Sequence, residues 1–166
     1  MFNDHRDNWR LVMDVLIEFI VSFASSVGFG LITNVPRRSL PAAGITGSVA
    51  WVAYYLVLQV NHGLILPNFT AAIVIGILGN ISAVLFRVPV NIIYVPSLVS
   101  LVPGGIMYLG MRSFTLGKES STSQYMFNSL TIAISLAVGF VVAEVVFYRI
   151  KPLLTRLINH AKKFES

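Results

Sequence analysis

Two acidic side chains stand in apolar surroundings. Glu144 lies near the end of a long apolar stretch, and Glu18 lies near the start of another. Carboxylates embedded in apolar helices are costly, and in membrane proteins they often mark proton or ion pathways. Pairing with a nearby base, such as Arg149, or solvation at an interface also explains a carboxylate near a helix end. The residues alone leave both interpretations open, so Glu144 and Glu18 are candidate proton-coupling groups.

A second group of residues suits the binding of a small polar solute. Asn80 lies in an uncharged stretch, where its amide would either meet a solute or form a bond between helices. Proline lacks the backbone donor, so a Pro-Gly-Gly unit leaves carbonyl groups free. Inside a membrane, such groups are tolerated only where protein or a water-filled cavity meets them. The predicted polar route consists of Asn34, Pro36, Asn80, Arg87, Pro103, Gly104, Gly105 and Tyr108.

The sequence lacks the residues and motifs that most enzymes and cofactor sites require. The chain has no cysteine, which removes disulfides, thiolate metal sites and cysteine nucleophiles. It also lacks the H-E-x-x-H pair, the G-x-S-x-G elbow and a phosphate-binding glycine loop followed by lysine. We therefore predict a protein that is not an enzyme, with no catalytic residue, no metal and no cofactor.

The composition is that of a membrane protein. Of the 166 residues, 55% are hydrophobic and only 11% are charged, whereas a soluble domain carries about 25% charged residues. The mean hydropathy is +0.77. Residues 39–86 contain no Asp, Glu, Lys or Arg, and neither do residues 88–111 or 120–143. A helix crosses the hydrocarbon core with about 20 apolar residues, so these runs predict an all-α integral membrane protein.

Breaks in hydropathy divide residues 1–150 into a membrane domain of about five transmembrane helices. The expected segments are residues 15–33, 41–60, 69–86, 91–111 and 125–148. The fourth is irregular, because Pro89, Pro96 and Pro103 recur every seven residues. Each proline bends or breaks a helix. This segment is either a kinked spanning helix or a broken one that lines a cavity.

Basic residues give the orientation. With five spans, one side of the membrane holds four basic residues, namely Arg6, Arg10, Arg112 and Lys118. The other side holds eight: Arg37, Arg38, Arg87, Arg149, Lys151, Arg156, Lys162 and Lys163. The positive-inside rule then predicts a multi-pass protein of the cell (plasma or inner) membrane, with the N-terminus outside and the C-terminus cytoplasmic. Residues 151–166 have the pattern of a basic amphipathic tail resting on the bilayer surface, and no nucleic-acid partner is indicated.

Three stretches together resemble the threonine/serine exporter family, in its short form that corresponds to the C-terminal half. They are residues 29–38 continuing into 43–47, then Arg87 with Pro89, and finally residues 95–105 with Tyr108 and Met111. They occur in the order and at the spacing of the family, and the resemblance covers most of residues 10–150.

The resemblance implies a secondary exporter built from two related membrane halves. A short chain of this type is the small subunit and works with a larger partner subunit. The substrates implied are threonine and serine or, for some two-chain members, succinate, exported at the expense of the proton gradient. The alternative is a structural subunit that stabilises its partner without lining the route. Small residues at four-residue spacing also predict close packing against another chain or a second copy of this one.

Overall fold

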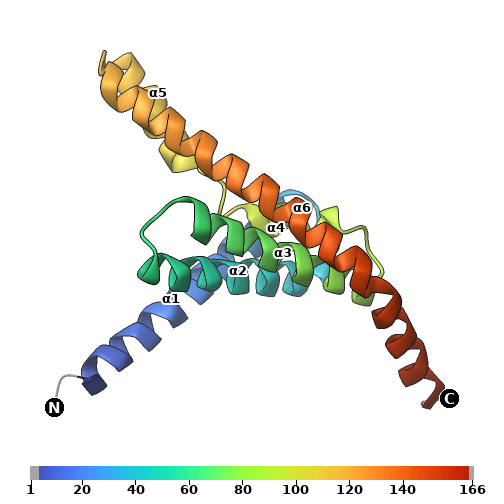
Figure 1. The fold of residues 1–166 in the computed structure, drawn as a ribbon. Coiled ribbons are helices and arrows are strands. Elements are labelled where there is room, and N and C mark those ends of the chain that lie inside the picture. The colour runs from blue at the N-terminus through green and yellow to red at the C-terminus, as the bar shows by residue number, and fades with distance from the viewer. Residues whose placement is uncertain (1–3, 165–166) are drawn as a thin grey trace.

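A computed structural model describes the backbone of residues 4–164 and the side chains of residues 9–149. No β-strand occurs in the described range. The elements in order are α1 (Asp4–Ile32), a short 3₁₀ turn η1 (Arg37–Ser39), α2 (Leu40–Val60), α3 (Ile65–Phe86), α4 (Asn91–Leu98), α5 (Gly104–Thr115) and α6 (Glu119–Phe164) (Figure 1).

Within the described residues, four helical stretches are long and apolar enough to cross a membrane: Trp9–Ile32, Arg37–Val60, Ile65–Phe86 and Glu119–Arg149. Their outward faces carry large apolar side chains, for example Ile20 at 63% exposed and Val141 at 64%. A monomeric soluble protein rarely exposes so much contiguous apolar surface. The chain is therefore an all-α membrane bundle, as the composition predicted.

The fourth segment is broken, which is one of the two alternatives that its prolines left open. The helix α4 has only eight residues, about 12 Å at 1.5 Å per residue, which is too short to cross the bilayer. Residues 99–103 leave the helical path, and α5 begins immediately after Pro103. Because Pro103 cannot donate a backbone hydrogen bond, a continuous helix would have a gap at this position.

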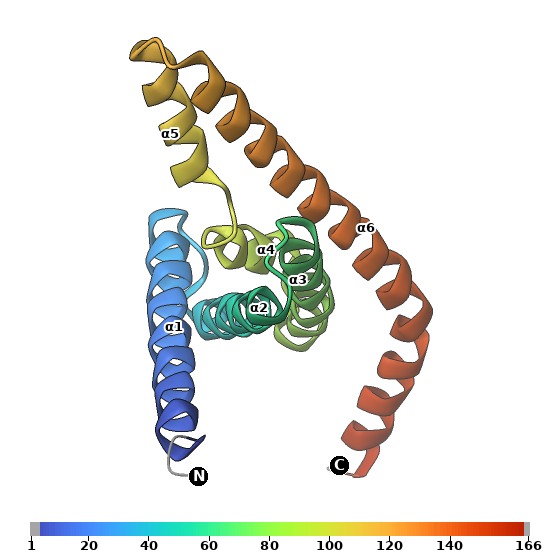
Figure 2. The same cartoon turned by 60° about the vertical axis from the view of Figure 1, so that its left-hand side comes forward.

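The helices pack in a series. α3 lies between α2 and α6, α1 packs on the other side of α2, and α4 is enclosed by α1, α2 and α3. α5 packs along the first part of α6, and the two form an antiparallel arm that extends beyond α2 and α3 (Figure 2). The core between α2, α3 and α6 combines three alanines with four larger aliphatic residues: Ala50, Ala71, Ala72, Ile75, Leu101, Ile132 and Leu136.

Glycines bring α3 and α6 into close contact. A side chain at Gly76 would collide with Ala143, and one at Gly139 would meet Ala72 and the backbone of Phe69. Residue numbers therefore increase in the same direction along the contact on both helices, which means that α3 and α6 run in parallel (Figure 1). The chain between them, α4 with α5, must return to the side on which α3 begins.

Three helices extend beyond the expected segments. α1 begins at Asp4 and α3 at Ile65, so Pro67 lies in the first turn of α3, where its missing donor does no harm. α6 does not end near residue 148 but continues to Phe164, because a proline can kink a long helix without ending it. The amphipathic face expected for residues 151–166 lies outside the described side chains.

Candidate functional site

The structure joins two of the predicted residues, Asn80 and Glu144, through a third, Tyr94. The Tyr94 hydroxyl donates to Oε1 of Glu144 at 2.8 Å, and the Asn80 amide donates to the same oxygen at 3.0 Å. The Asn80 amide also lies 2.5 Å from the Tyr94 hydroxyl. We refer to these three residues as the polar cluster. It connects α3, α4 and α6.

The backbone of α3 completes the polar cluster. The carbonyl oxygen of Gly76 lies 3.0 Å from both the Asn80 amide and the Tyr94 hydroxyl. The Asn80 amide carries two protons for three acceptors, so these hydrogen bonds are shared. The carboxylate, hydroxyl, amide and carbonyl groups of this network can therefore exchange hydrogen-bond partners without leaving any of these groups unpaired.

Two glycines make this arrangement possible. The absence of a side chain at Gly79 leaves room for the ring of Tyr94 to lie against α3. The absence of one at Gly76 lets Ala143 approach, which places the next residue of α6, Glu144, beside Asn80. Close approach of two helices through small residues is the usual way in which membrane helices associate.

A second polar site lies where α4 is interrupted. A pocket of about 180 Å³, which we call the break pocket, is lined by Trp51, Tyr54, Asn68, Ser100, Leu101, Val102, Pro103, Gly105, Ile106 and Ile132. A single water needs about 10–15 Å³ of such space, so the break pocket has room for a small solute. Of the predicted route residues, Pro103 and Gly105 line it, and Gly104 is their immediate neighbour.

Two residues of α1, Glu18 and Ser22, form hydrogen bonds with residues that line the break pocket. The indole of Trp51 donates a 2.6 Å hydrogen bond to Oε2 of Glu18. The Ser22 hydroxyl lies 3.2 Å from the hydroxyl of Ser100 and 3.3 Å from the carbonyl oxygen of Gly47. Glu18 is therefore bonded to a residue that lines the break pocket, whereas Glu144 belongs to the polar cluster.

The remaining predicted residues lie elsewhere. Asn34 ends α1 with φ of 57° and, with Pro36, lines a shallow pocket of about 270 Å³ at the start of α4. Arg87 ends α3 with φ of 54° and is exposed. Tyr108 is 67% exposed on α5 and does not line the break pocket. The residues predicted to form one route thus lie at several separate sites in the structure.

Sequence reasoning missed Tyr94, Trp51, Tyr54, Asn68 and Ser100. Each is an ordinary residue for a membrane helix, and its role depends on contacts between distant segments. Of these five, only Asn68 gave a signal in the sequence, as a polar residue one turn from a helix start. In the structure it is only 2% exposed. Its amide donates to the carbonyl oxygen of Leu64 at 2.7 Å, so part of its burial is explained by its own helix.

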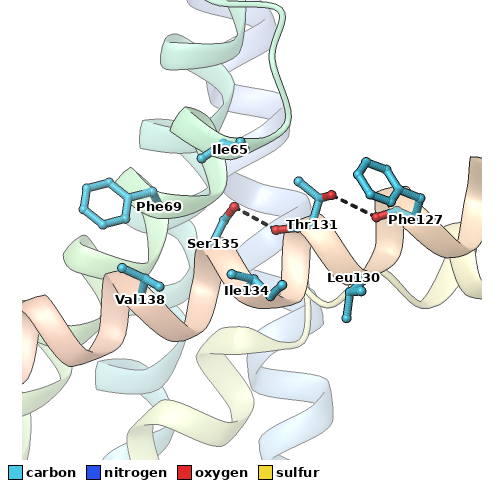
Figure 3. A pocket seen from close by; sticks show the side chains of 8 residues that line it. All are labelled: Ile65, Phe69, Phe127, Leu130, Thr131, Ile134, Ser135 and Val138. Carbon is cyan, nitrogen blue, oxygen red and sulfur yellow. Dashed lines mark hydrogen bonds between the residues drawn. The ribbon is translucent and has the colours of Figure 1, made fainter.

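A further pocket of about 480 Å³ between α3 and α6 is apolar (Figure 3). Its two hydroxyl groups are occupied within α6, because Thr131 donates to the carbonyl oxygen of Phe127 and Ser135 donates to that of Thr131. The remaining lining is aliphatic or aromatic. This pocket suits an acyl chain or an apolar side chain and not a polar solute. Among the described residues, no group of three or more His, Asp or Glu could hold a metal ion.

Comparison with known proteins agrees with the resemblance noted in the sequence. Over 151 residues the chain is 24% identical to an uncharacterized protein of Haemophilus influenzae (strain ATCC 51907 / DSM 11121 / KW20 / Rd). That alignment covers 86% of this chain but 51% of the relative, so the chain spans about half of the relative's length. No solved structure matches.

Residues 18–146 match the sequence profile of the family described as "Threonine/Serine exporter, ThrE". The matched range contains Glu18, the broken segment and Glu144, and therefore both polar sites. It is well over half of the chain. The chain belongs to the threonine/serine exporter family.

Proposed function

We propose that this chain is the small membrane subunit of a secondary exporter. It moves threonine, serine or a C4 dicarboxylate such as succinate out of the cell, coupled to protons and together with a larger partner subunit. The observation that carries this proposal is the break pocket, a partly polar cavity of about 180 Å³ at the interruption between α4 and α5. Transporters commonly bind substrates where a spanning helix is discontinuous.

The break pocket has groups for the two charged ends of threonine or serine, an ammonium and a carboxylate, and its carboxylate site also suits one end of succinate. Hydroxyl and amide oxygens of Tyr54, Asn68 and Ser100 can accept hydrogen bonds from an ammonium group. The N–H of Gly104 donates to the carbonyl oxygen of Val102 at 2.7 Å. The N–H groups that α5 offers at its start are therefore those of Gly105 and Ile106, where the positive end of the helix dipole favours a carboxylate. Asn34, Pro36 and Arg87 are assigned to the cytoplasmic entrance, and Tyr108 to the exit along α5.

The proton would be carried by a carboxylate. Glu144 is the stronger candidate, because the polar cluster offers hydrogen bonds that can rearrange when Glu144 gains or loses a proton. Glu18 is the second candidate, because Trp51 links it to the break pocket. Proton relays in membrane transporters are commonly built from such acidic residues.

The basic residues at the helix ends support the proposed orientation of the chain in the membrane. The α1–α2 and α3–α4 connections, which contain Arg37, Arg38 and Arg87, lie at one end of the helices. Because α3 and α6 run in parallel, Arg149 lies at that end too. The positive-inside rule assigns this end to the cytoplasm and the N-terminus to the outside.

Efflux from cells that lack other exporters tests the proposal. This chain, the larger family chain, and both together would be expressed, and the cells preloaded with labelled threonine or labelled succinate. We expect efflux only with both chains, and its loss with a protonophore. Absence of efflux in every combination, with both chains detected in the membrane, would refute the exporter proposal.

A structural subunit is the second candidate, since the chain spans about half the length of the relative that it matches. In that case the partner alone lines the route. Asn80→Ala and Glu144→Gln would then lower the amount of complex without changing the efflux rate per complex. A lower rate at equal complex abundance would exclude this candidate.

A further inference from the structure

Glu144 faces the outside of the bundle, although the polar side chain to which it is bonded, Asn80, is buried. Ser22, Asn80 and Ser135 are buried within the bundle, at 3%, 9% and 5% exposed. Glu144 is exposed, although it lies beside Asn80, which is seven residues or about 10 Å from the end of α3 at Arg87. A carboxylate at membrane depth is therefore open on the outer surface of the chain.

Among the residues whose side chains are described, the space in front of this carboxylate is lined by α6 alone. It is a hollow of about 510 Å³ whose described lining consists of Glu144, Val145, Tyr148 and Arg149, all on α6. The same face of α6 carries Val141, and the apolar residues on it are strongly exposed. Within the described part of the chain, no second helix contributes a side chain to this hollow, so the face of α6 is open there to a helix of another chain.

Contact with lipid acyl chains is unfavourable for this face of α6, because it carries a carboxylate. A charged residue at the centre of a spanning helix costs about 2.5–3.5 kcal/mol on insertion scales, and less toward the interface. The described hydrogen bonds reach only Oε1 of Glu144, and a carboxylate can accept about four hydrogen bonds. Hydrogen-bond donors at the remaining acceptor positions would stabilise the carboxylate. The exposed apolar residues around it would be buried by a packed helix.

We propose that the face of α6 formed by Val141, Glu144, Val145 and Tyr148 is the docking surface for a transmembrane helix of the larger partner subunit. That helix presents a hydrogen-bond donor, basic or amide, to Glu144 and so completes the polar cluster. This inference rests on the proposed two-subunit exporter and specifies where the subunits meet.

A second copy of this chain is a worse occupant of the surface. A two-fold axis along the membrane normal would place Glu144 of one copy beside Glu144 of the other. Two carboxylates at that distance repel each other in a medium of low dielectric constant. The charge therefore favours a different chain that brings a donor.

Site-specific crosslinking tests the proposal, because the chain has no cysteine of its own. Val145→Cys and Val141→Cys would each be labelled with a benzophenone maleimide in membranes that contain the tagged larger family chain. Val21→Cys on α1, with a similarly exposed side chain, is the matched control. We expect an adduct with the larger chain from positions 145 and 141 and none from position 21.

Glu144→Leu should weaken co-purification of the two chains about tenfold, the effect of losing one charge-assisted hydrogen bond. Glu144→Gln, which keeps an acceptor, should weaken it less. An adduct of this chain with itself, or an equal yield from position 21, would overturn the docking surface. So would the absence of any adduct.

Efflux measured in the same cells separates this test from that of the function. Efflux without an adduct at positions 141 and 145 would overturn the docking surface and leave the exporter in place. An adduct without efflux would support the docking surface and count against the exporter.

Discussion

The hydroxyl oxygen of Tyr94 lies 2.8 Å from Oε1 of Glu144, which is 50 residues further along the chain. This bond ties the short helix α4 to the long helix α6 at a point where Asn80 of α3 also donates. The polar cluster therefore connects the broken segment to the rest of the bundle. Several of the expected effects of substitution depend on it.

Tyr94→Phe removes the donor and leaves the ring in place against Gly79. We expect a small loss of stability, about 0.6 kcal/mol, which is typical of a hydrogen bond between membrane helices. The rate of efflux should fall much more, because Glu144 loses the partner that positions it. Initial rates and the thermal midpoint of the purified complex would be compared. Equal small changes in both would show that the bond is only structural.

Gly76→Ala should destabilise the bundle. The added methyl group would collide with Ala143 at the contact between α3 and α6, and overpacking of this kind costs about 1–3 kcal/mol. Gly28→Ala is the control, because no atom lies within 4 Å of a side chain added there. The thermal midpoint in detergent is the measurement. A normal midpoint for Gly76→Ala would contradict the close contact of α3 and α6.

Gly105→Leu should block the break pocket while the chain still folds. No atom lies within 4 Å of a Cβ at Gly105, so the side chain has room, yet the residue lines the pocket. We expect normal membrane insertion and loss of efflux. Gly104→Leu, equally free at its Cβ but not part of the lining, should have the smaller effect. Unchanged efflux with Gly105→Leu would move the route elsewhere.

The bond between Trp51 and Glu18 can be measured with a double-mutant cycle. Trp51→Phe, Glu18→Leu and the double substitution would be compared by their free energies of unfolding. We expect a coupling energy of about 1 kcal/mol, within the range of hydrogen bonds inside membranes. A coupling energy near zero would mean that the bond does not hold α1 against α2.

The course of the broken segment can be tested with single cysteines and a membrane-impermeant maleimide. His62→Cys and Lys118→Cys should react from outside the cell, and Arg38→Cys should not. If α4 and α5 together cross the membrane, Lys118 lies on the same side as His62. Reaction of Lys118→Cys only after permeabilisation would show that the segment enters and returns on the cytoplasmic side.

The helices and the break could be predicted because they depend on local sequence. Residues 39–86 contain no charge, so their helices had to be apolar and long. Pro96 and Pro103 remove backbone donors at fixed positions, which predicted a kink or a break in this segment. The helix continues through Pro96, and the break lies directly before α5, at residues 99–103. The end of α6 was less predictable, since a proline near a helix end bends or stops it depending on the packing.

The candidate site was predicted only in part. Asn80 and Glu144 were noticed because a polar group in an apolar stretch is unusual by itself. Their contact depends on Gly76 and on the parallel course of α3 and α6, which are set by packing between distant segments. Tyr94 gave no signal, because a tyrosine in a membrane helix is common and its partners are remote in sequence.

The length of α6 has a mechanical consequence. Its 46 residues extend about 69 Å, more than twice the hydrocarbon thickness of about 30 Å. One continuous helix, bent toward its C-terminal end, thus joins the arm with α5 to the part of α6 that carries Glu144 and continues beyond it (Figure 2). A thinner or thicker bilayer changes the tilt of such a helix. Because Glu144 on α6 is bonded to Asn80 on α3 and Tyr94 on α4, we expect a change in this tilt to strain the polar cluster, so that the length of the lipid acyl chains affects its hydrogen bonds.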